Sequence, residues 1–388
     1  MKEFQKRKIR SLFNYLDLHN RYYHEIFKVY GVDINADGDE MLEMMPILTK
    51  ADIRKNAESY FSNDDVKVVR ELTSGSVGVP LICYKSVQER SQAAMNVWKA
   101  RRERDPYVSP QNYYNFFDAN EHVTGDFANL NEGQLVEYFD QLKTLNLRWM
   151  SGPISTIYTM ARLINKGRIS NSSIKYIELF GEYADVEQRT YIEEAFGCKT
   201  VVHYGTRETW CIGYECEKGY LHVQENVMLV ETNDKNVQYD NGNSEIIVTS
   251  LYNRYMPFVR YNLMDIGKLV YDKCECGKSS PRIILAGGRV GDMVKGKQVL
   301  GNNFFNRAVG HLVKRGYDDI ERFRVEQVEL NHFMLYIVKA ETYTDETTCV
   351  LKSILKESLG ENSEFTFKFV EKIDALPNGK YKNFECLI

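Results

Sequence analysis

The sequence predicts an α/β protein with a large N-terminal domain, in which helices cover mixed sheets, and a small mobile C-terminal α+β domain. From about residue 66 the pattern alternates strand, turn and helix, which is typical of a parallel or mixed sheet covered by helices. After residue 220 extended runs dominate, and from about residue 323 strands and a helix alternate again. The 388 residues, 43% of them hydrophobic, are enough for one large core or two unequal ones.

The first 62 residues form a helical leader in this prediction. Apolar residues recur there at three- and four-residue steps and would share one face: Leu12, Tyr15, Leu16, Tyr23 and Phe27. Thr49 is expected to cap a short helix over residues 50–60. Residues 33–38 imitate the start of a calcium loop, but Met44 stands where the bidentate glutamate is needed. We therefore predict an ordinary turn at residues 33–38.

The remaining elements follow in chain order. Before residue 220 we expect strands at 66–69, 174–180 and 199–204, and helices at 86–102, 131–166 and 187–196. After it we expect strands at 245–251, 257–261, 268–271, 323–329, 334–340 and 364–370, and a helix at 345–359. Three glycines within residues 287–291 suggest a hinge, with Gly291 as its pivot. The predicted domains are therefore residues 1–287 and 288–388.

Composition excludes several classes of protein. The net charge of −4 does not favour a nucleic-acid surface. The N-terminus lacks the apolar segment of a signal peptide, and no apolar run approaches the ~18 residues that span a bilayer. Eight scattered cysteines are typical of a reducing compartment. We therefore expect a soluble cytoplasmic protein with no nucleic-acid partner and no membrane span; its oligomeric state stays open.

A glycine- and hydroxyl-rich segment, residues 71–80, follows a predicted strand and precedes a helix. Backbone N–H groups and hydroxyls in such a segment can converge on phosphate oxygens. The segment is not a Walker loop, because its glycine spacing differs and no Lys-Ser/Thr follows. Taken alone, it is weak evidence for phosphate binding, because such strand-to-helix turns are common.

Four further motifs follow this segment in order. They are Tyr204-Gly205-Thr206-Arg207-Glu208, Arg260-Tyr261-Asn262-Leu263-Met264-Asp265, Gly288-Arg289-Val290-Gly291-Asp292 and Leu376-Pro377-Asn378-Gly379-Lys380. The ordered set resembles the adenylate-forming superfamily of acyl-CoA synthetases and peptide adenylation domains. In particular it resembles the branch of phenylacetate–CoA ligases and capsular-polysaccharide (CapK-like) proteins. Residues 48–54, Gly181-Glu182 and residues 193–199 add to that likeness, which covers nearly the whole chain.

The resemblance implies an AMP-forming ligase. A carboxylate would attack the α-phosphate of ATP to give an acyl-adenylate and pyrophosphate, and a nucleophile would then displace AMP. Because the first step joins two anions, positive charge and preorganised donors must lower its barrier. The implied cofactors are ATP and Mg²⁺, with CoA as one candidate acceptor.

The resemblance also assigns site residues. The outgoing phosphates would be held by Thr73, Ser74, Gly75, Ser76 and Gly78. Tyr204 would stack near adenine, beside Gly181, Glu182, Gly205 and Thr206, and Asp265 would accept hydrogen bonds from the ribose. The three catalytic groups would be Glu208, which binds Mg²⁺, Arg289 near the ribose or phosphates, and Lys380 from the small domain. In isolation, a tyrosine such as Tyr204 is more often a core residue, an aspartate such as Asp265 is usually a turn residue, and a lysine such as Lys380 is usually a surface residue.

Four positions depart from the family pattern: Val77, Arg207, Met264 and Gly291. These departures leave open a degenerate nucleotide-binding protein without turnover. The charged residues Glu208, Asp265, Arg289 and Lys380 are all present, which favours an active enzyme.

A separate set of residues has the chemistry of a zinc site. Cys216, His222, Cys274 and Cys276 offer three thiolates and an imidazole, enough for a closed tetrahedral structural site. Some proteins of the resembled branch carry a similar set. The alternative is a group of free buried cysteines, whereas a disulfide between Cys274 and Cys276 would be strained.

The substrate is a small carboxylic acid that the sequence does not identify. Residues 112–117 and 149–153 are aromatic-rich and would contribute to the acid pocket or to the core. Two acceptors stay open. The acyl group would pass to CoA in a thioester-forming ligase, or to an amine on a sugar or small metabolite in an amide-forming ligase.

Overall fold

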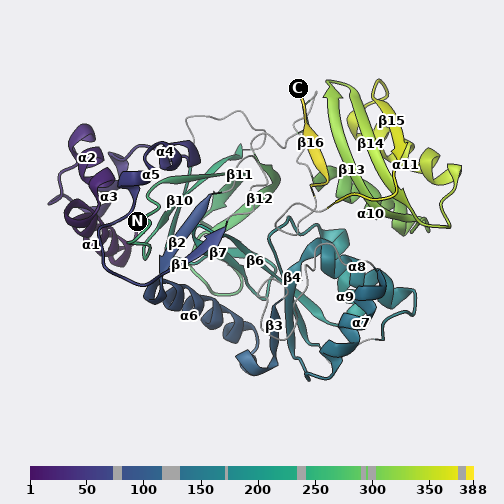
Figure 1. Cartoon of the computed structure of the whole chain (residues 1–388), viewed down its shortest axis with the longest axis horizontal. Helices are drawn as coiled ribbons and strands as arrows, with labels where there is room; N and C mark the ends of the chain where they lie inside the picture. The colour runs from purple at the N-terminus through teal and green to yellow at the C-terminus, as the bar shows by residue number, and fades with distance from the viewer. Residues whose placement is uncertain are drawn as a thin grey trace. The chain divides into compact units, whose positions relative to one another are not determined.

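The computed structural model covers the whole chain and describes all residues except 73–80, 116–131, 171–173, 234–241, 290–293, 296–302 and 375–381 (Figure 1). The chain divides into two compact units, residues 1–107 with 203–285 and residues 108–202 with 286–388. This division does not test the predicted domains 1–287 and 288–388, which stay a prediction. Within the described residues, no helix is long and apolar enough to cross a membrane.

The helical leader of the first unit is confirmed. Its helices are α1 (Glu3–His19), α2 (Arg21–Tyr30), α3 (Gly38–Glu43), α4 (Lys50–Lys55) and α5 (Ala57–Tyr60). Thr49 caps α4 as predicted, because its side chain accepts a hydrogen bond from the Asp52 N–H and the Asp52 carboxylate accepts one from the Thr49 N–H. The imitation calcium loop is a turn in which the Asp33 carboxylate accepts from the Asn35 N–H.

The sheets of the first unit are mainly antiparallel. Strands β1 (Val68–Leu72) and β2 (Ile82–Ser86) form a hairpin, and α6 (Val87–Arg104) follows it. The part of the larger sheet that belongs to this unit has the strand order β6-β7-β8-β12-β11-β10-β9. Its strands are β6 (Lys199–Thr206), β7 (Trp210–Glu215), β8 (Leu221–Val223), β9 (Met228–Thr232), β10 (Ser244–Ser250), β11 (Tyr261–Val270) and β12 (Arg282–Arg289).

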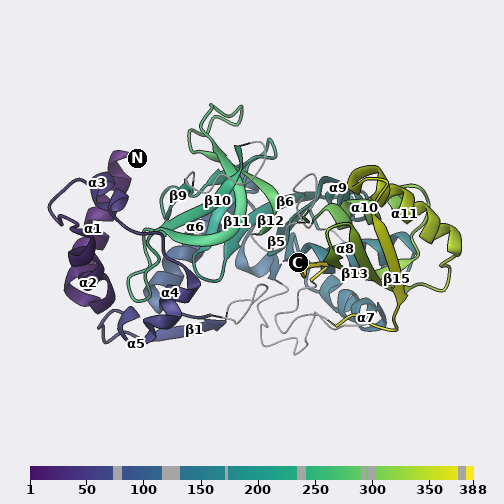
Figure 2. The same ribbon diagram turned by 90° about the horizontal axis from the view of Figure 1, so that it is seen from above.

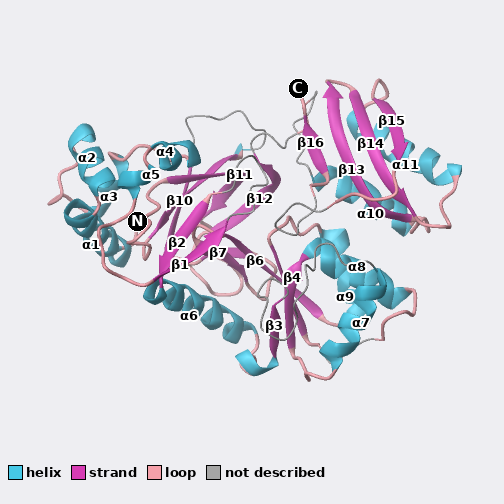
Figure 3. Cartoon of the chain, viewed as in Figure 1, coloured by secondary structure: helices cyan, strands magenta, loops and turns pink. Residues whose placement is uncertain are grey.

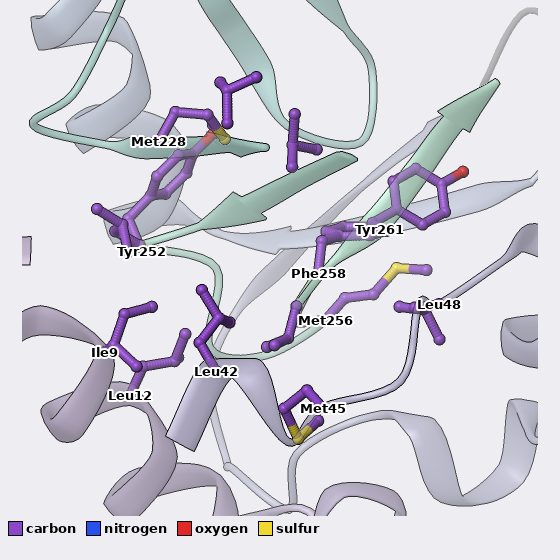
Figure 4. Packing of buried hydrophobic residues seen from close by; sticks show 14 of the residues in the cluster. Ile9, Leu12, Leu42, Met45, Leu48, Met228, Tyr252, Met256, Phe258 and Tyr261 are labelled. Atoms are coloured by element: carbon purple, nitrogen blue, oxygen red, sulfur yellow. The ribbon is translucent and has the colours of Figure 1, made fainter. Parts of the chain in front are cut away.

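One apolar core joins the leader to this sheet (Figure 4). Side chains of the leader, such as Ile9, Leu42 and Leu48, belong to one buried cluster with Phe258 and Tyr261 of the sheet region. A parallel bridge between Leu48 and Tyr261 connects the two parts through the backbone as well. The residues just after Leu48 are therefore held close to the start of β11.

The first part of the second unit is a parallel sheet with helices. Strands β3 (Tyr113–Asn115), β4 (Trp149–Pro153) and β5 (Tyr176–Phe180) pair in parallel, and α7 (Glu132–Lys143), α8 (Ile154–Asn165) and α9 (Val186–Phe196) accompany them (Figure 3). The single helical stretch predicted over 131–166 is wrong, because β4 interrupts it. The apolar run around Trp149 fits a buried strand as well as a helix, and Gly152 and Pro153 favour a break.

The last part of the second unit is the predicted small α+β unit. Its sheet has the order β15-β14-β13-β16, and α10 and α11 pack together on one face of it (Figure 2). The elements are α10 (Asn303–Lys314), β13 (Ile320–Glu329), β14 (His332–Lys339), α11 (Asp345–Leu359), β15 (Glu364–Phe369) and β16 (Phe384–Cys386). A separate apolar cluster that includes Phe305, Phe333 and Leu355 forms its core.

Candidate active site

Several predicted site residues lie outside the described residues: Thr73, Ser74, Gly75, Ser76 and Gly78 of the glycine-rich segment, and Lys380. Arg289 is the last residue of β12, and only its backbone is described. The departures Val77 and Gly291 also lie outside the described residues. Of the predicted site residues, the structure therefore describes those around Glu208 and Asp265 in the first unit and, separately, Gly181 and Glu182 in the second.

Glu208 lies in the turn that joins β6 to β7. This turn is tight, since a Cβ atom on Gly205 would come within 2.0 Å of the Trp210 carbonyl oxygen, so only glycine fits there. Trp210 has a φ of 55°, a left-handed conformation that a bulky residue rarely adopts. The Thr206 hydroxyl accepts a hydrogen bond from the Thr209 N–H and closes the turn. Glu208 thus projects from a backbone with little conformational freedom.

The Glu208 carboxylate is buried and charged. The Lys50 ammonium lies 3.2 Å from its Oε1 atom, and the Tyr261 hydroxyl donates to the same atom at 3.0 Å. Burial alone would raise the pKa of Glu208, but the charge of Lys50 and the hydrogen bonds that Glu208 accepts outweigh it, and the pKa is lowered. A buried carboxylate that stays ionised is a suitable ligand for a hard divalent cation.

Asp265 lies on β11 and pairs with Tyr204, the first residue of the predicted Tyr-Gly motif. The Tyr204 hydroxyl donates to Asp265 Oδ2 at 2.8 Å. Met264, one of the departures, has a φ of 63°, and its N–H donates to the Asn262 side-chain oxygen. Glycine adopts this conformation without strain, so the family's usual glycine fits the backbone found here. The structure thus brings Tyr204 and Asp265 together, and the nucleotide contacts that the resemblance assigns to them stay a prediction.

Gly181 and Glu182 follow β5 in the second unit. Gly181 has a φ of 79°, where a side chain would be strained. The Glu182 carboxylate accepts hydrogen bonds from the Ser155 N–H at 2.8 Å and from the Ser155 hydroxyl at 2.9 Å. Glu182 therefore satisfies the N-terminal turn of α8, which is a structural role beside the predicted nucleotide contact.

Sequence reasoning gave no role to Lys50 and Tyr261, the two partners of Glu208. Lys50 appeared only as the first residue of a helix, and Tyr261 only as a member of the motif that ends at Asp265. Lys50 lies within residues 48–54 and Tyr261 within residues 260–265, and these two family-like motifs were the only sign in the sequence that either residue belongs to the site. Their approach to Glu208 depends on the bridge between Leu48 and Tyr261, which no local pattern predicts.

Replacing Lys50 should change how the protein responds to acid. Since the folded-state pKa of Glu208 is lowered, its ionisation stabilises the fold above the ordinary glutamate pKa, and this contribution disappears as the pH falls through the folded value. In Lys50→Met the positive charge that lowers the pKa of Glu208 is gone, so burial raises this pKa. We expect the melting temperature of Lys50→Met to lie below wild type at pH 7, and the gap to shrink towards pH 4. Lys28→Met, which removes an exposed ion pair with Glu25, should show no such convergence, and a constant gap for Lys50→Met would refute the account.

The predicted metal ligands also converge. Cys216 and His222 come from the β7–β8 hairpin, Cys274 and Cys276 from the segment between β11 and β12, and their ligand atoms all lie within 4.8 Å of one another. His222 Nδ1 lies 3.0 Å from the Ser280 carbonyl oxygen, which can only accept, so Nδ1 carries the proton and the Nε2 lone pair faces Cys276 at 3.4 Å. Burial lowers the pKa of His222, which favours the neutral, metal-binding form. The donor set fits zinc.

Comparison with known proteins agrees with this fold. Residues 299–384 match the family described as the CapK C-terminal domain. The chain is 23% identical to Protein CapK of Staphylococcus aureus over 403 residues, which covers 97% of this chain and 87% of that protein. The resemblance to the CapK-like branch is thereby confirmed.

Comparison with solved structures identifies the fold. One is 2-hydroxyisobutyryl-CoA ligase in the postadenylation state with 2-HIB-AMP, at a TM-score of 0.79 and 16% identity over 98% of this chain and 88% of that one. Another is the GH3.15 acyl acid amido synthetase, at a TM-score of 0.64 and 12% identity over 95% and 86% of the two chains. The chain therefore has the α/β fold of adenylate-forming ligases, as predicted.

Proposed function

We propose that this protein is an AMP-forming ligase that activates a carboxylic acid as its acyl-adenylate. The observation that carries the proposal is the buried but ionised Glu208, held in a strained turn beside Lys50 and Tyr261. The Tyr204–Asp265 pair, from β6 and β11 of the same unit, and the fold of the chain support it further. A fold hosts many activities, so the site residues rather than the fold define the reaction.

Each group has a defined task in this reaction. Asp265 would accept hydrogen bonds from the ribose hydroxyls, and Tyr204, which donates to Asp265, would lie against the adenine with Gly181, Glu182, Gly205 and Thr206. Glu208 would hold Mg²⁺, which neutralises phosphate charge when bound. Residues 73–78 would cradle the phosphates, and Arg289 and Lys380 would supply positive charge. The carboxylate oxygen bonds to the α-phosphorus, the bond to the β-phosphate oxygen breaks, and pyrophosphate leaves with that electron pair.

The acceptor in the second step is CoA or an amine. One similar structure is a CoA ligase and another an acid amido synthetase, so the fold accommodates both outcomes. We favour CoA, in an acid–thiol ligase. The likeness to Protein CapK supports the alternative, an amide-forming enzyme of capsular polysaccharide biosynthesis. We place the reaction in the cytoplasm, where ATP and CoA are available.

A panel of carboxylic acids tests the proposal. With ATP, Mg²⁺ and hydroxylamine, at least one acid should yield a hydroxamate together with stoichiometric pyrophosphate. CoA and small amines, offered afterwards in place of hydroxylamine, then identify the acceptor class. Calorimetry with ATP tests the alternative to an active enzyme. Binding of ATP without turnover of any acid would show a degenerate nucleotide-binding protein.

We further propose that Cys216, His222, Cys274 and Cys276 bind a structural Zn²⁺. In a tetrahedral site, ligand atoms lie roughly 3.3–3.8 Å apart, so the observed cluster needs only a small contraction. The ion would tie the β7–β8 hairpin to the segment between β11 and β12. It would have no part in the reaction, because all four donors are used in holding it.

Metal analysis of protein purified without chelator should give about one equivalent of zinc. Cys274→Ser should lower this to below about half an equivalent and lower the melting temperature, because a ligand is lost. Cys211→Ser, which changes a buried cysteine of β7 outside the cluster, should keep its zinc. Zinc below about half an equivalent in the wild type would contradict the assignment.

A further inference from the structure

A second pair of buried opposite charges lies on the β1–β2 hairpin of the first unit. The Lys85 ammonium lies 2.9 Å from Glu71 Oε2, and the Lys85 side chain has no exposed surface. Burying an ammonium is strongly unfavourable unless its charge is paired and its N–H groups find acceptors. The partners of Lys85 are therefore informative about its role.

Lys85 has a second acceptor in the turn that carries Glu208. Its ammonium donates to the carbonyl oxygen of Arg207 at 2.5 Å. This carbonyl belongs to the peptide group whose nitrogen is that of Glu208. A charged donor on this oxygen fixes the plane of the peptide, and with it the direction in which the Glu208 side chain leaves the backbone.

Glu71 secures the other side of the same turn. Its Oε2 atom accepts a hydrogen bond from the Trp210 indole N–H at 3.0 Å, two residues after Glu208. The half-exposed Arg90 lies 3.2 Å from the remaining oxygen of Glu71 and adds a further positive charge. The ion pair thus contacts the turn on both sides of Glu208, at the carbonyl of Arg207 and at the ring of Trp210.

The charges of this pair and those around Glu208 act on a common neighbour. Cys83 precedes Lys85 by two residues on β2 and is fully buried. Burial raises the pKa of its thiol, the charges of Glu208 and Glu71 raise it further, and those of Lys85 and Lys50 oppose them. Lys50, Glu208, Lys85 and Glu71 therefore all act on the Cys83 thiol through their charges.

We propose that Lys85 is a positioning residue for Glu208: it holds the Arg207–Glu208 peptide group and so sets the direction of the carboxylate that binds Mg²⁺. The proposal rests on the function proposed above. The contact with the Arg207 carbonyl ties the ion pair to the turn that carries Glu208 and not to the hairpin alone. Groups that orient a metal ligand in this way typically change metal affinity by roughly 10- to 100-fold when they are removed.

The test measures metal affinity without an acid substrate. Mn²⁺ replaces Mg²⁺ as the probe, α,β-methylene-ATP replaces ATP, and free Mn²⁺ is followed by electron paramagnetic resonance. Lys85→Met should raise the Kd of Mn²⁺ in this complex by roughly tenfold or more. Lys85→Arg keeps a charged donor and should stay within about threefold of wild type. A Kd for Lys85→Met equal to that of wild type, in folded protein, would overturn the proposal.

Three controls separate positioning from stability. Lys6→Met breaks an ion pair with Asp39 in the leader and should leave the Kd unchanged. Glu71→Gln keeps Lys85 on the Arg207 carbonyl and an acceptor for Trp210, so it should lower the melting temperature and leave the Kd within about threefold. If Lys85→Met does not fold, Glu71→Gln/Lys85→Met leaves no unpaired buried charge and should still show the tenfold loss. A normal Kd in that double variant would likewise refute the proposal.

Glu208→Gln separates a failure of the proposed function from a failure of the positioning role of Lys85. It should abolish Mn²⁺ binding that depends on the protein. If it binds Mn²⁺ like wild type, the assignment of Glu208 in the proposed function fails. If it loses Mn²⁺ while Lys85→Met retains it, Glu208 keeps its role and only the positioning by Lys85 is wrong.

Discussion

Lys380→Ala should slow formation of the acyl-adenylate by roughly 10²-fold or more. The resemblance places this ammonium between the acid's carboxylate oxygen and the α-phosphate, where charge redistributes as the bond forms. Such a contact is stronger in the transition state than in the ground state, so its loss should appear in turnover. ATP affinity should change little, because most of the binding groups lie outside residues 288–388. Single-turnover release of pyrophosphate and ATP calorimetry measure the two quantities.

Acyl transfer, the second half-reaction, shows whether Lys380 acts in adenylation alone. If residues 288–388 swing about Gly291 between the two steps, Lys380 leaves the site, and transfer from preformed acyl-adenylate should survive in Lys380→Ala. Lys382→Ala is the matched control, since Lys382 donates to Glu385 at 3.1 Å and has a structural partner. Loss of adenylation in Lys382→Ala but not in Lys380→Ala would show that the motif is assigned in the wrong register.

Glu208→Gln should reduce adenylation by roughly 10²-fold or more and remove its saturation by Mg²⁺. The amide keeps the shape of the side chain and an acceptor for the Tyr261 hydroxyl, but it loses the charge that Lys50 now pairs with. Because Lys50 is partly exposed, water can solvate its ammonium, and the fold should persist. Pyrophosphate release at varied Mg²⁺ concentration measures the effect.

Glu89→Gln is the control for a buried glutamate outside the site. Glu89 caps α6 and accepts hydrogen bonds from the backbone N–H groups of Arg254 and Tyr255. This variant should lower the melting temperature and keep the wild-type dependence on Mg²⁺. If Glu208→Gln and Glu89→Gln lowered activity equally, the effect of Glu208 would be one of stability and the Mg²⁺ assignment would be wrong.

Local chemistry explains the parts of the fold that the sequence predicted well. Thr49 and Asp52 satisfy each other's backbone N–H groups, and three- or four-residue spacing determines which leader side chains are buried. The cysteine and histidine positions predicted a cluster because few other roles bring these residue types together. These features depend on residue type and spacing, both of which can be read along the chain.

The features that the sequence did not predict depend on packing between distant segments. Strand β4 was hidden because a short apolar run fits a helix or a strand until its neighbour β5 is known. The pairing of Lys50 with Glu208 requires the bridge from Leu48 to Tyr261. The contact of Lys85 with a backbone carbonyl cannot be recognised from the pattern of residue types along the sequence. Buried charges of this kind are where sequence reasoning is weakest, because their partners are set by the tertiary fold.

The fate of oxygen in the carboxylic acid tests the central claim most directly. An acid that supports turnover is labelled with ¹⁸O in its carboxylate and incubated with ATP, Mg²⁺ and the acceptor. If the acid is activated as an acyl-adenylate, attack on the carbonyl carbon leaves one labelled oxygen in AMP, and mass spectrometry should find one ¹⁸O in each AMP released. Labelled inorganic phosphate together with ADP, or AMP without label, would contradict the account.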